Sequence, residues 1–221
     1  MNIAGIFGLV AAVAWSAGAW AEGANQSVEK LRQKGYSVTS VTPIFSQLLK
    51  ISHPKEFSIA PAFEKTNGGF YIREAVLPGE TVDNWTQMIT ATGNKDLASK
   101  PGTAPKAVLD VVAEGFKRAC PNSYAAQILN EDKVSGFDAV AAVLSCGASP
   151  TTSGKTSETT LFVVIKGQND FYQVQWAERT APSNTPMRID VWKWRDRLRA
   201  LNPIKLCPII AGEKPPYPSC A

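Results

Sequence analysis

Residues 137–179 read FDAVAAVLSCGASPTTSGKTSETTLFVVIKGQNDFYQVQWAER. Three runs rich in β-branched and aromatic residues lie within this segment, at 137–146, 157–166 and 171–179, and such runs are typical of strands. A loop of Ser, Thr, Gly and Pro separates the first two runs, and a turn at 167–170 joins the last two. We therefore predict neighbouring strands that pair in an antiparallel sheet.

Further strands are predicted on both sides of residue 100. The short apolar run 47–51 comes first. Residues 69–76 and 85–92 alternate apolar with polar side chains, and the connection Leu-Pro-Gly-Glu-Thr at 77–81 predicts that they form a hairpin. Residues 125–129 make another short strand.

Two segments have the spacing of amphipathic helices. Pro105 opens the first, which ends before Pro121, and its apolar side is predicted to include Val111 and Phe116. The second is predicted from Pro186 to about Leu201. Strands interrupted by one helix and followed by another predict an α+β fold, in which an antiparallel sheet has its helices packed on one face.

The first 21 residues carry no charged side chain and end in Ala19-Trp20-Ala21. Small residues such as Ala19 and Ala21, separated by one residue, are typical of a signal-peptidase site. We therefore predict a cleaved signal peptide at 1–21. A transmembrane anchor is the alternative, because the apolar stretch approaches the length of a span. Glycines and Ser16 dilute that stretch, and no Lys or Arg follows it closely. No transmembrane anchor is expected after cleavage.

Removal of 21 of the 221 residues leaves 200, enough for one sizeable core. We divide them into a polar N-terminal segment at 22–40, a single α+β domain at 41–206 and a Pro-rich tail at 207–221. The formal net charge of +4 is mildly basic and excludes no class of function.

All four cysteines lie in the C-terminal half of the chain: Cys120, Cys146, Cys207 and Cys220. An even number in an exported chain indicates disulfides, with three possible pairings. We favour Cys120–Cys146 and Cys207–Cys220, each worth about 3 kcal/mol. A zinc site is disfavoured because no two cysteines have C-x₂₋₄-C spacing and His53, an expected surface residue, is the only histidine. We expect no metal.

Motifs for catalysis or cofactor binding are weak. The segment Ser-Gly-Lys-Thr at 153–156 lacks the preceding glycine of a phosphate-binding loop and leads into a strand, so no cofactor is expected. Carboxylates gather around the predicted hairpin connection, at Glu74, Glu80 and Asp83. If they converge in a cleft, they could serve as a general acid and base. Glu80, near Trp85, could instead shape a ligand-facing rim.

The predicted C-terminal helix has the most distinctive surface. Arg188, Trp192, Arg195 and Arg199 fall at helical spacing, and residues 188–205 carry a net charge of +4, equal to that of the whole chain. Such a surface suits an acidic envelope protein or an anionic surface. A solvated face is the alternative. Nucleic acid is not an expected partner because no motif that reads it is present.

Two segments carry a resemblance to a family. FYIRE at 70–74 and GETVDNWTQMIT at 79–90 resemble an uncharacterised family of small secreted proteins of Gram-negative bacteria, in which a G-E-T…N-W-T…M-I-T pattern recurs. The order of elements is similar to the PsbP-like fold. The resemblance implies a periplasmic or secreted location and a scaffold for binding, and it assigns no catalytic residue.

We therefore expect a non-catalytic periplasmic or secreted binding protein. One alternative is an envelope hydrolase that uses the carboxylates at 74–83. Another is an immunity or inhibitor protein that acts on a secreted enzyme, which the sequence does not distinguish from other binding proteins.

Overall fold

The computed structural model describes residues 27, 28, 30, 31, 33, 34 and 38–221. The chain divides into two compact units, residues 1–36 and residues 37–221. The predicted signal peptide, 1–21, and most of the segment 22–40 lie outside the described residues. All the elements discussed below belong to the second unit.

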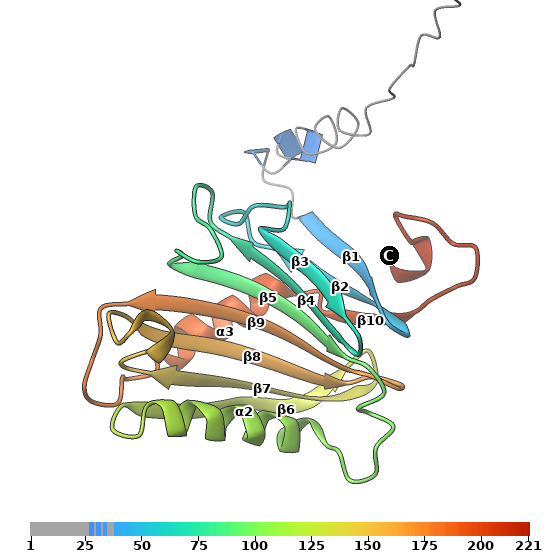
Figure 1. Cartoon of the computed structure of the whole chain (residues 1–221). Coiled ribbons are helices and arrows are strands. Elements are labelled where there is room, and N and C mark those ends of the chain that lie inside the picture. The colour runs from blue at the N-terminus through green and yellow to red at the C-terminus, as the bar shows by residue number, and fades with distance from the viewer. Residues whose placement is uncertain (1–26, 29, 32, 35–37) are drawn as a thin grey trace, which may run out of the picture. The chain divides into compact units, whose positions relative to one another are not determined.

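The second unit contains two antiparallel sheets (Figure 1). One has seven strands in the order β3-β4-β5-β9-β8-β7-β6, and the other has three in the order β1-β2-β10. This arrangement, with two α-helices among the elements of residues 38–221, confirms the predicted α+β class. The elements are β1 (Val38–Ile44), β2 (Gln47–His53), β3 (Phe63–Asn67), β4 (Phe70–Val76), β5 (Gln87–Asn94), α2 (Pro105–Ala119), β6 (Tyr124–Val134), β7 (Phe137–Cys146), η1 (Pro150–Thr152), β8 (Ser157–Lys166), β9 (Phe171–Thr180), α3 (Val191–Leu201), β10 (Lys205–Pro208) and η2 (Pro218–Cys220).

The predicted strands at 137–146 and 157–166 are confirmed as β7 and β8, and the strand at 171–179 is confirmed as β9 with one more residue. Their near-continuous apolar runs reflect burial on both faces of the sheet. In β7, Val140 belongs to one hydrophobic cluster, whereas its neighbour Ala141 belongs to another. Strands whose two faces are both buried lose the usual apolar–polar alternation.

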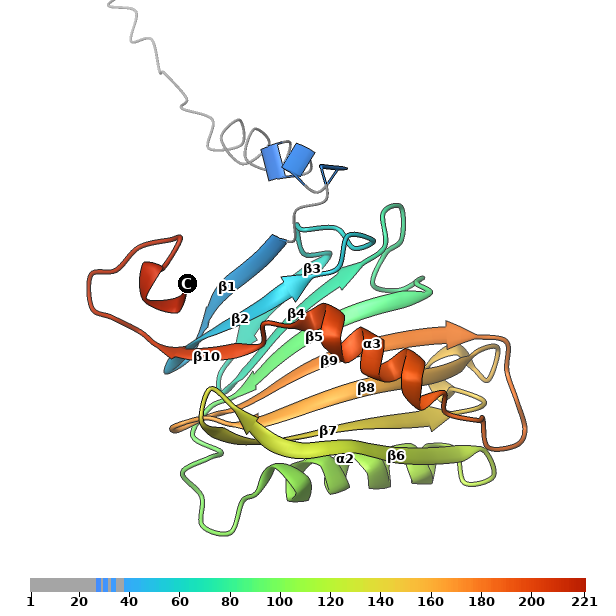
Figure 2. The same ribbon diagram turned by 180° about the vertical axis from the view of Figure 1, so that it is seen from behind.

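The two helices cover opposite faces of the seven-stranded sheet (Figures 1 and 2), so the prediction that both pack on one face is wrong. Leu109 of α2 packs in the cluster that contains Val140. Trp194 and Leu201 of α3 pack in the cluster that contains Ala141. The physical reason is that the central strands are apolar on both faces, and each face needs its own cover.

The three-stranded sheet shares the α3 side of the molecule. Leu49 of β2 and Leu206 of β10 are buried in the same cluster as Trp194. The small sheet and α3 thus cover one face of the large sheet together (Figure 2). On the other face, α2 packs on β6, β7 and β8.

The first helix has the predicted bounds, but its buried side differs from the prediction. Val111 is 73% exposed, whereas Leu109 is 3% exposed and enters the core. The second helix begins at Val191 rather than Pro186. Asp190 ends the preceding segment, and its carboxylate caps the helix by accepting bonds from the amides of residues 192 and 193 at 3.0 and 3.1 Å.

Both favoured disulfides are present. Cys120, just after α2, is bonded to Cys146 at the end of β7. Cys207 of β10 is bonded to Cys220, which holds the C-terminal tail against the small sheet. His53, expected at the surface, is instead buried at the end of β2, and its Nε2 lies 2.9 Å from Oγ of Ser40.

Replacing Cys120 and Cys146 together by alanine is expected to lower the free energy of unfolding by about 3 kcal/mol, because the cross-link restricts a long loop of the unfolded chain. Urea denaturation without reductant measures this change. Adding reductant to the wild-type protein breaks both cross-links and should lower the midpoint further. Equal midpoints for the oxidised wild type and the variant would contradict the expected contribution.

Candidate functional site

The structure places the four predicted residues of the C-terminal surface in solvent. Trp192 is 72% exposed, and Arg195 and Arg199 are also exposed along α3. Arg188 is exposed too, but it precedes the helix. We call these four residues the α3 surface.

Contacts within the α3 surface are limited to neighbours on the same helix. The guanidinium of Arg195 lies 5.7 Å from the ring centroid of Trp192. Arg199 forms an ion pair with Asp196 one turn away. Neither contact covers the indole, so a large apolar side chain stands in water beside a cation. Trp and Arg are the residues most enriched at the energetic centres of protein interfaces.

The remaining basic residues of α3 are used by the fold. The guanidinium of Arg197 lies between the rings of Trp176 and Trp194, 4.8 and 4.6 Å from their centroids. It forms an ion pair with Glu178 at 2.7 Å, and Lys193 pairs with the same carboxylate at 2.7 Å. Burial lowers the pKa of Arg197, and the carboxylate opposes that shift.

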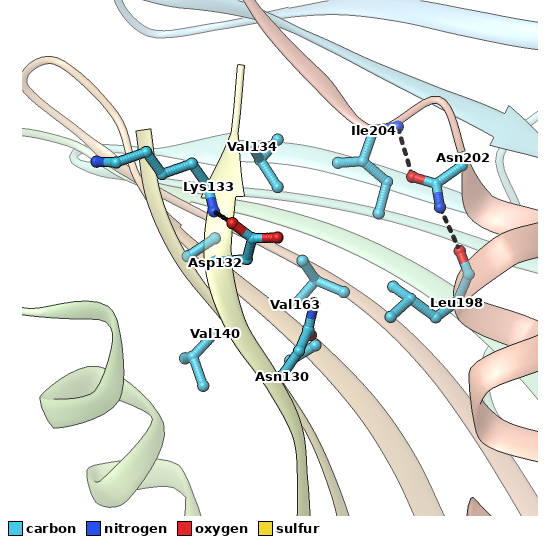
Figure 3. Close-up of a pocket in the computed structure, with 11 residues that line it drawn as sticks. Asn130, Asp132, Lys133, Val134, Val140, Val163, Leu198, Asn202 and Ile204 are labelled. Carbon is cyan, nitrogen blue, oxygen red and sulfur yellow. Dashed lines mark hydrogen bonds between the residues drawn. The ribbon is translucent and has the colours of Figure 1, made fainter. Parts of the chain in front are cut away.

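A pocket of about 150 Å³ lies between the C-terminal end of α3 and the strands β6 and β7 (Figure 3). Apolar side chains, including Val163, Leu198 and Ile204, contribute to its lining. Polar groups come from Asn130 and Asp132 of β6 and from Asn202 after α3. Ligand pockets for drug-sized molecules are usually about 300–1,000 Å³. This one has room for a single side chain of a partner.

A β-bulge gives this pocket its polar side. The register of β6 with β7 shifts between Ile128 and Asn130. Leu129 is buried in the core on the α3 side, and Asn130, opposite Ala141, is placed on that side as well. Asn202 closes the helix end: its amide donates to the carbonyl of residue 198 at 3.2 Å, and its oxygen accepts from the amide of residue 204 at 3.3 Å. The pocket is therefore preformed.

Glu80 and Trp85, which were predicted to form a ligand-facing rim, make contacts within the fold instead. The carboxylate of Glu80 accepts bonds from the amide and hydroxyl of Thr86 at 3.0 and 2.5 Å. Trp85 is buried, and the guanidinium of Arg179 lies 3.7 Å from its ring centroid. Both side chains thus stabilise the connection between β4 and β5.

The carboxylates of the alternative hydrolase are found in different settings. Glu74 is half-buried on β4, and desolvation raises the pKa of its carboxyl. Asp83 is exposed in the loop, and Glu80 is engaged by Thr86. Within the described part of the chain, no cluster of three or more His, Cys, Asp or Glu could hold a metal ion.

The chain shows a distant likeness to a yeast protein. One solved structure that it resembles is that of the Ran-binding protein Mog1p of Saccharomyces cerevisiae, at 10% sequence identity and a TM-score of 0.41, over 66% of this chain and 79% of Mog1p. No inference about fold or function follows from so low an identity and score.

Sequence comparison identifies no relative: no family model and no curated protein matches the chain. Among the residues that the structure describes, no helix has the length and hydropathy needed to cross a membrane.

The polar residues of the pocket, Asn130, Asp132 and Asn202, were not predicted from the sequence. The only local signal was Asn202 before Pro203, at the end of a predicted helix. The bulge that turns Asn130 toward α3 depends on pairing with β7, and nothing in the sequence of β6 marks it.

Proposed function

We propose that this protein is a non-catalytic binding protein that works outside the cytoplasm and contacts an acidic protein partner through the α3 surface. The observation that carries the proposal is the 72% exposure of Trp192 beside the cation of Arg195. Leaving an indole in water is unfavourable, and an interface that covers it recovers the hydrophobic free energy.

The pocket at the end of α3 supports the same function. Trp192 and Asn202 are separated by ten residues, or about 15 Å along a helix. A partner that spans this distance would cover the indole and insert one side chain between Leu198 and Asn130. Arg195 and Arg199 lie between the two positions and would attract a partner with acidic groups.

A location in the periplasm or outside the cell is part of the proposal. Two disulfides are consistent with maturation in an oxidising compartment, because thiols in the cytoplasm are kept reduced. An immunity or inhibitor protein would bind its target enzyme through the same surface. The hydrolase alternative has no comparable support, because the carboxylate of Glu80 is held by Thr86.

The test is the capture of a partner by the protein with Arg195→Glu and Arg199→Glu. We expect the variant to recover at least about tenfold less of the partner from an envelope extract than the wild type, because it replaces two attractive charges by repulsive ones. Quantitative mass spectrometry measures the recovery. The wild-type recovery is expected to fall as salt is added.

The matched control changes charge by the same amount on the other helix. Lys117→Glu with Arg118→Glu alters two exposed residues at the end of α2, and partner recovery should stay at the wild-type level. Equal recovery by the Arg195/Arg199 variant and the wild type would refute the α3 surface as the contact.

A further inference from the structure

β1 is the edge strand of the small sheet and has a neighbour on one side only. The order β1-β2-β10 means that β1 pairs with β2 alone, and Figure 2 shows it as the outermost strand. Pro43 of β1 has no N–H for a ladder, so its backbone faces away from β2. Bonded and non-bonded pairs alternate along an antiparallel ladder. Val41 and Thr39 therefore direct their N–H and C=O groups outward as well.

These outward backbone groups, which we call the free edge of β1, are unpaired within the described residues. Thr39 and Val41 form no backbone hydrogen bond beyond those of the ladder with β2. An exposed row of unpaired N–H and C=O groups is a template on which another strand can add.

The other edge strands carry features that prevent strand addition. β6 has a bulge and charged side chains at 131–133. β3 has only five residues, two of which are Glu64 and Lys65. β10 has four residues, and the amide of Leu206 donates to the hydroxyl of Ser135 at 3.1 Å. In contrast, β1 has seven residues without a charged side chain, and its register with β2 has no shift.

A groove of about 390 Å³ lies along the free edge of β1. Its lining includes Val41 and Pro43 of β1. The C-terminal tail contributes one wall, at residues 215–217, and Glu64 of β3 and Arg73 of β4 contribute the other. A single strand fits between two such walls. A second copy of the chain would bring the same walls to the edge and would be obstructed by them.

The groove has one cation that no carboxylate neutralises within the described residues. Arg73 pairs with Glu64 at 3.5 Å and donates to the carbonyl of residue 59 at 3.1 Å. Lys50 is the register partner of Val41, and its ammonium donates to the carbonyl of Cys220 at 3.0 Å. That bond uses one of the three donors of an ammonium group. The charge of Lys50 is therefore available to an anionic group in the groove.

We propose that the free edge of β1 binds an extended segment of another protein that carries an acidic side chain. The segment adds a fourth strand to the small sheet. Its main chain bonds to Thr39 and Val41, which supplies affinity, and its side chains supply specificity. A carboxylate beside Val41 meets the ammonium of Lys50. The stretch from Thr39 to Pro43 is about 13 Å long, which suits about five residues of the partner. This site is separate from the α3 surface.

The test begins with a phage-displayed library of random heptapeptides, selected on the intact oxidised protein. We expect enrichment of β-branched sequences that contain one Asp or Glu. When the best sequence is added as a synthetic peptide, the amides of Thr39 and Val41 should exchange hydrogen at least about tenfold more slowly, because they become hydrogen-bonded. Failure to enrich any peptide would overturn the proposal. Unchanged exchange at these two amides would do so too.

Val41→Pro tests the backbone contact directly. It removes an outward N–H without removing a ladder bond to β2, so it should weaken peptide binding by about tenfold or more. Val41→Ala is the matched control, because it shortens the same side chain and keeps the N–H. It should bind within about threefold of the wild type. Equal losses in the two variants would refute backbone pairing. Thr39→Pro makes the same change at the next outward position if Val41→Pro fails to fold.

Lys50→Gln tests the acidic preference. The wild type should bind the acidic peptide about fivefold more tightly than its amide counterpart, and the variant should bind the two equally. Lys65→Gln, on exposed β3, should keep the preference. A preference that survives Lys50→Gln would contradict the acidic partner. Sedimentation without peptide tests the second copy: a dimer that Val41→Pro dissociates would overturn the proposal.

Discussion

Replacing Asp170 by Asn is expected to lower the free energy of unfolding by about 4 kcal/mol, as the sum of several weakened or lost hydrogen bonds. This carboxylate is 1% exposed in the turn between β8 and β9. One oxygen accepts from the amide and hydroxyl of Ser46 at 3.0 and 2.5 Å and from the hydroxyl of Tyr172 at 3.2 Å. The other accepts from the amide of Asp96 at 2.7 Å.

These bonds join the turn between β1 and β2, the loop after β5 and the turn before β9. Asparagine would place an NH₂ group against at least one of the donors and would remove the charge that strengthens the others. Urea denaturation followed by tryptophan fluorescence measures the loss. Asp96→Asn is the matched control. The position has a left-handed backbone, which Asn tolerates, and only its amide contacts Asp170. Its effect should stay within about 0.5 kcal/mol.

The contribution of Asp170 should also depend on pH. Burial alone would raise the pKa of its carboxyl, but the hydrogen bonds from Ser46, Asp96 and Tyr172 outweigh burial and lower it. A carboxylate whose pKa is lower in the folded state stabilises the protein above its unfolded pKa, which is about 4. That stability is lost as the pH falls through the folded-state pKa. The difference between wild type and Asp170→Asn should therefore shrink below about pH 4, and a constant difference would contradict this role.

Replacing Arg197 by Ala is expected to lower the free energy of unfolding by about 3 kcal/mol, because it breaks a largely buried ion pair with Glu178. The carboxylate of Glu178 would keep only the more exposed Lys193 as its partner. The side chain of Arg197 is 13% exposed. Besides Glu178, it contacts the two indoles described above and donates to Oε1 of Gln87 at 3.1 Å. The substitution also removes the cation from between Trp176 and Trp194 and opens a cavity there.

Two related variants separate these contributions in thermal or urea denaturation. Arg197→Lys keeps the charge but not the planar group that stacks on two rings, so it should restore only part of the loss. Arg195→Ala, two residues away and exposed, should change the stability by less than about 0.5 kcal/mol. If Arg195→Ala proved as destabilising as Arg197→Ala, the buried ion pair would not account for the loss.

The sheet strands and α2 could be predicted from the sequence because their signals are local. The runs at 137–146 and 157–166 are long, apolar and bounded by turn residues, and both predicted strands have the observed bounds. The favoured disulfides are also observed. The spacing of α2 did not show that Leu109, rather than Val111, would enter the core, because the adjacent sheet decides which side of a helix is buried.

The positions of the helices on the sheet and the pocket beside α3 could not be predicted, because they depend on contacts between distant segments. The α3 surface, in contrast, was predicted from the spacing of Trp192 and Arg195. Asn130 reaches the pocket through a bulge set by β7. Asp190 was counted as part of the helix, although its carboxylate caps it.

The small sheet has a consequence for when the protein can fold. Its central strand, β2, lies near the start of the described chain, and its partner β10 lies near the end. Similarly, β5 can pair with β9 only after the residues of β9 have been synthesised. The core on the α3 side thus cannot close until nearly the whole polypeptide has been synthesised. A nascent chain of this topology stays open during translation, which is the state that the export proposed above would require.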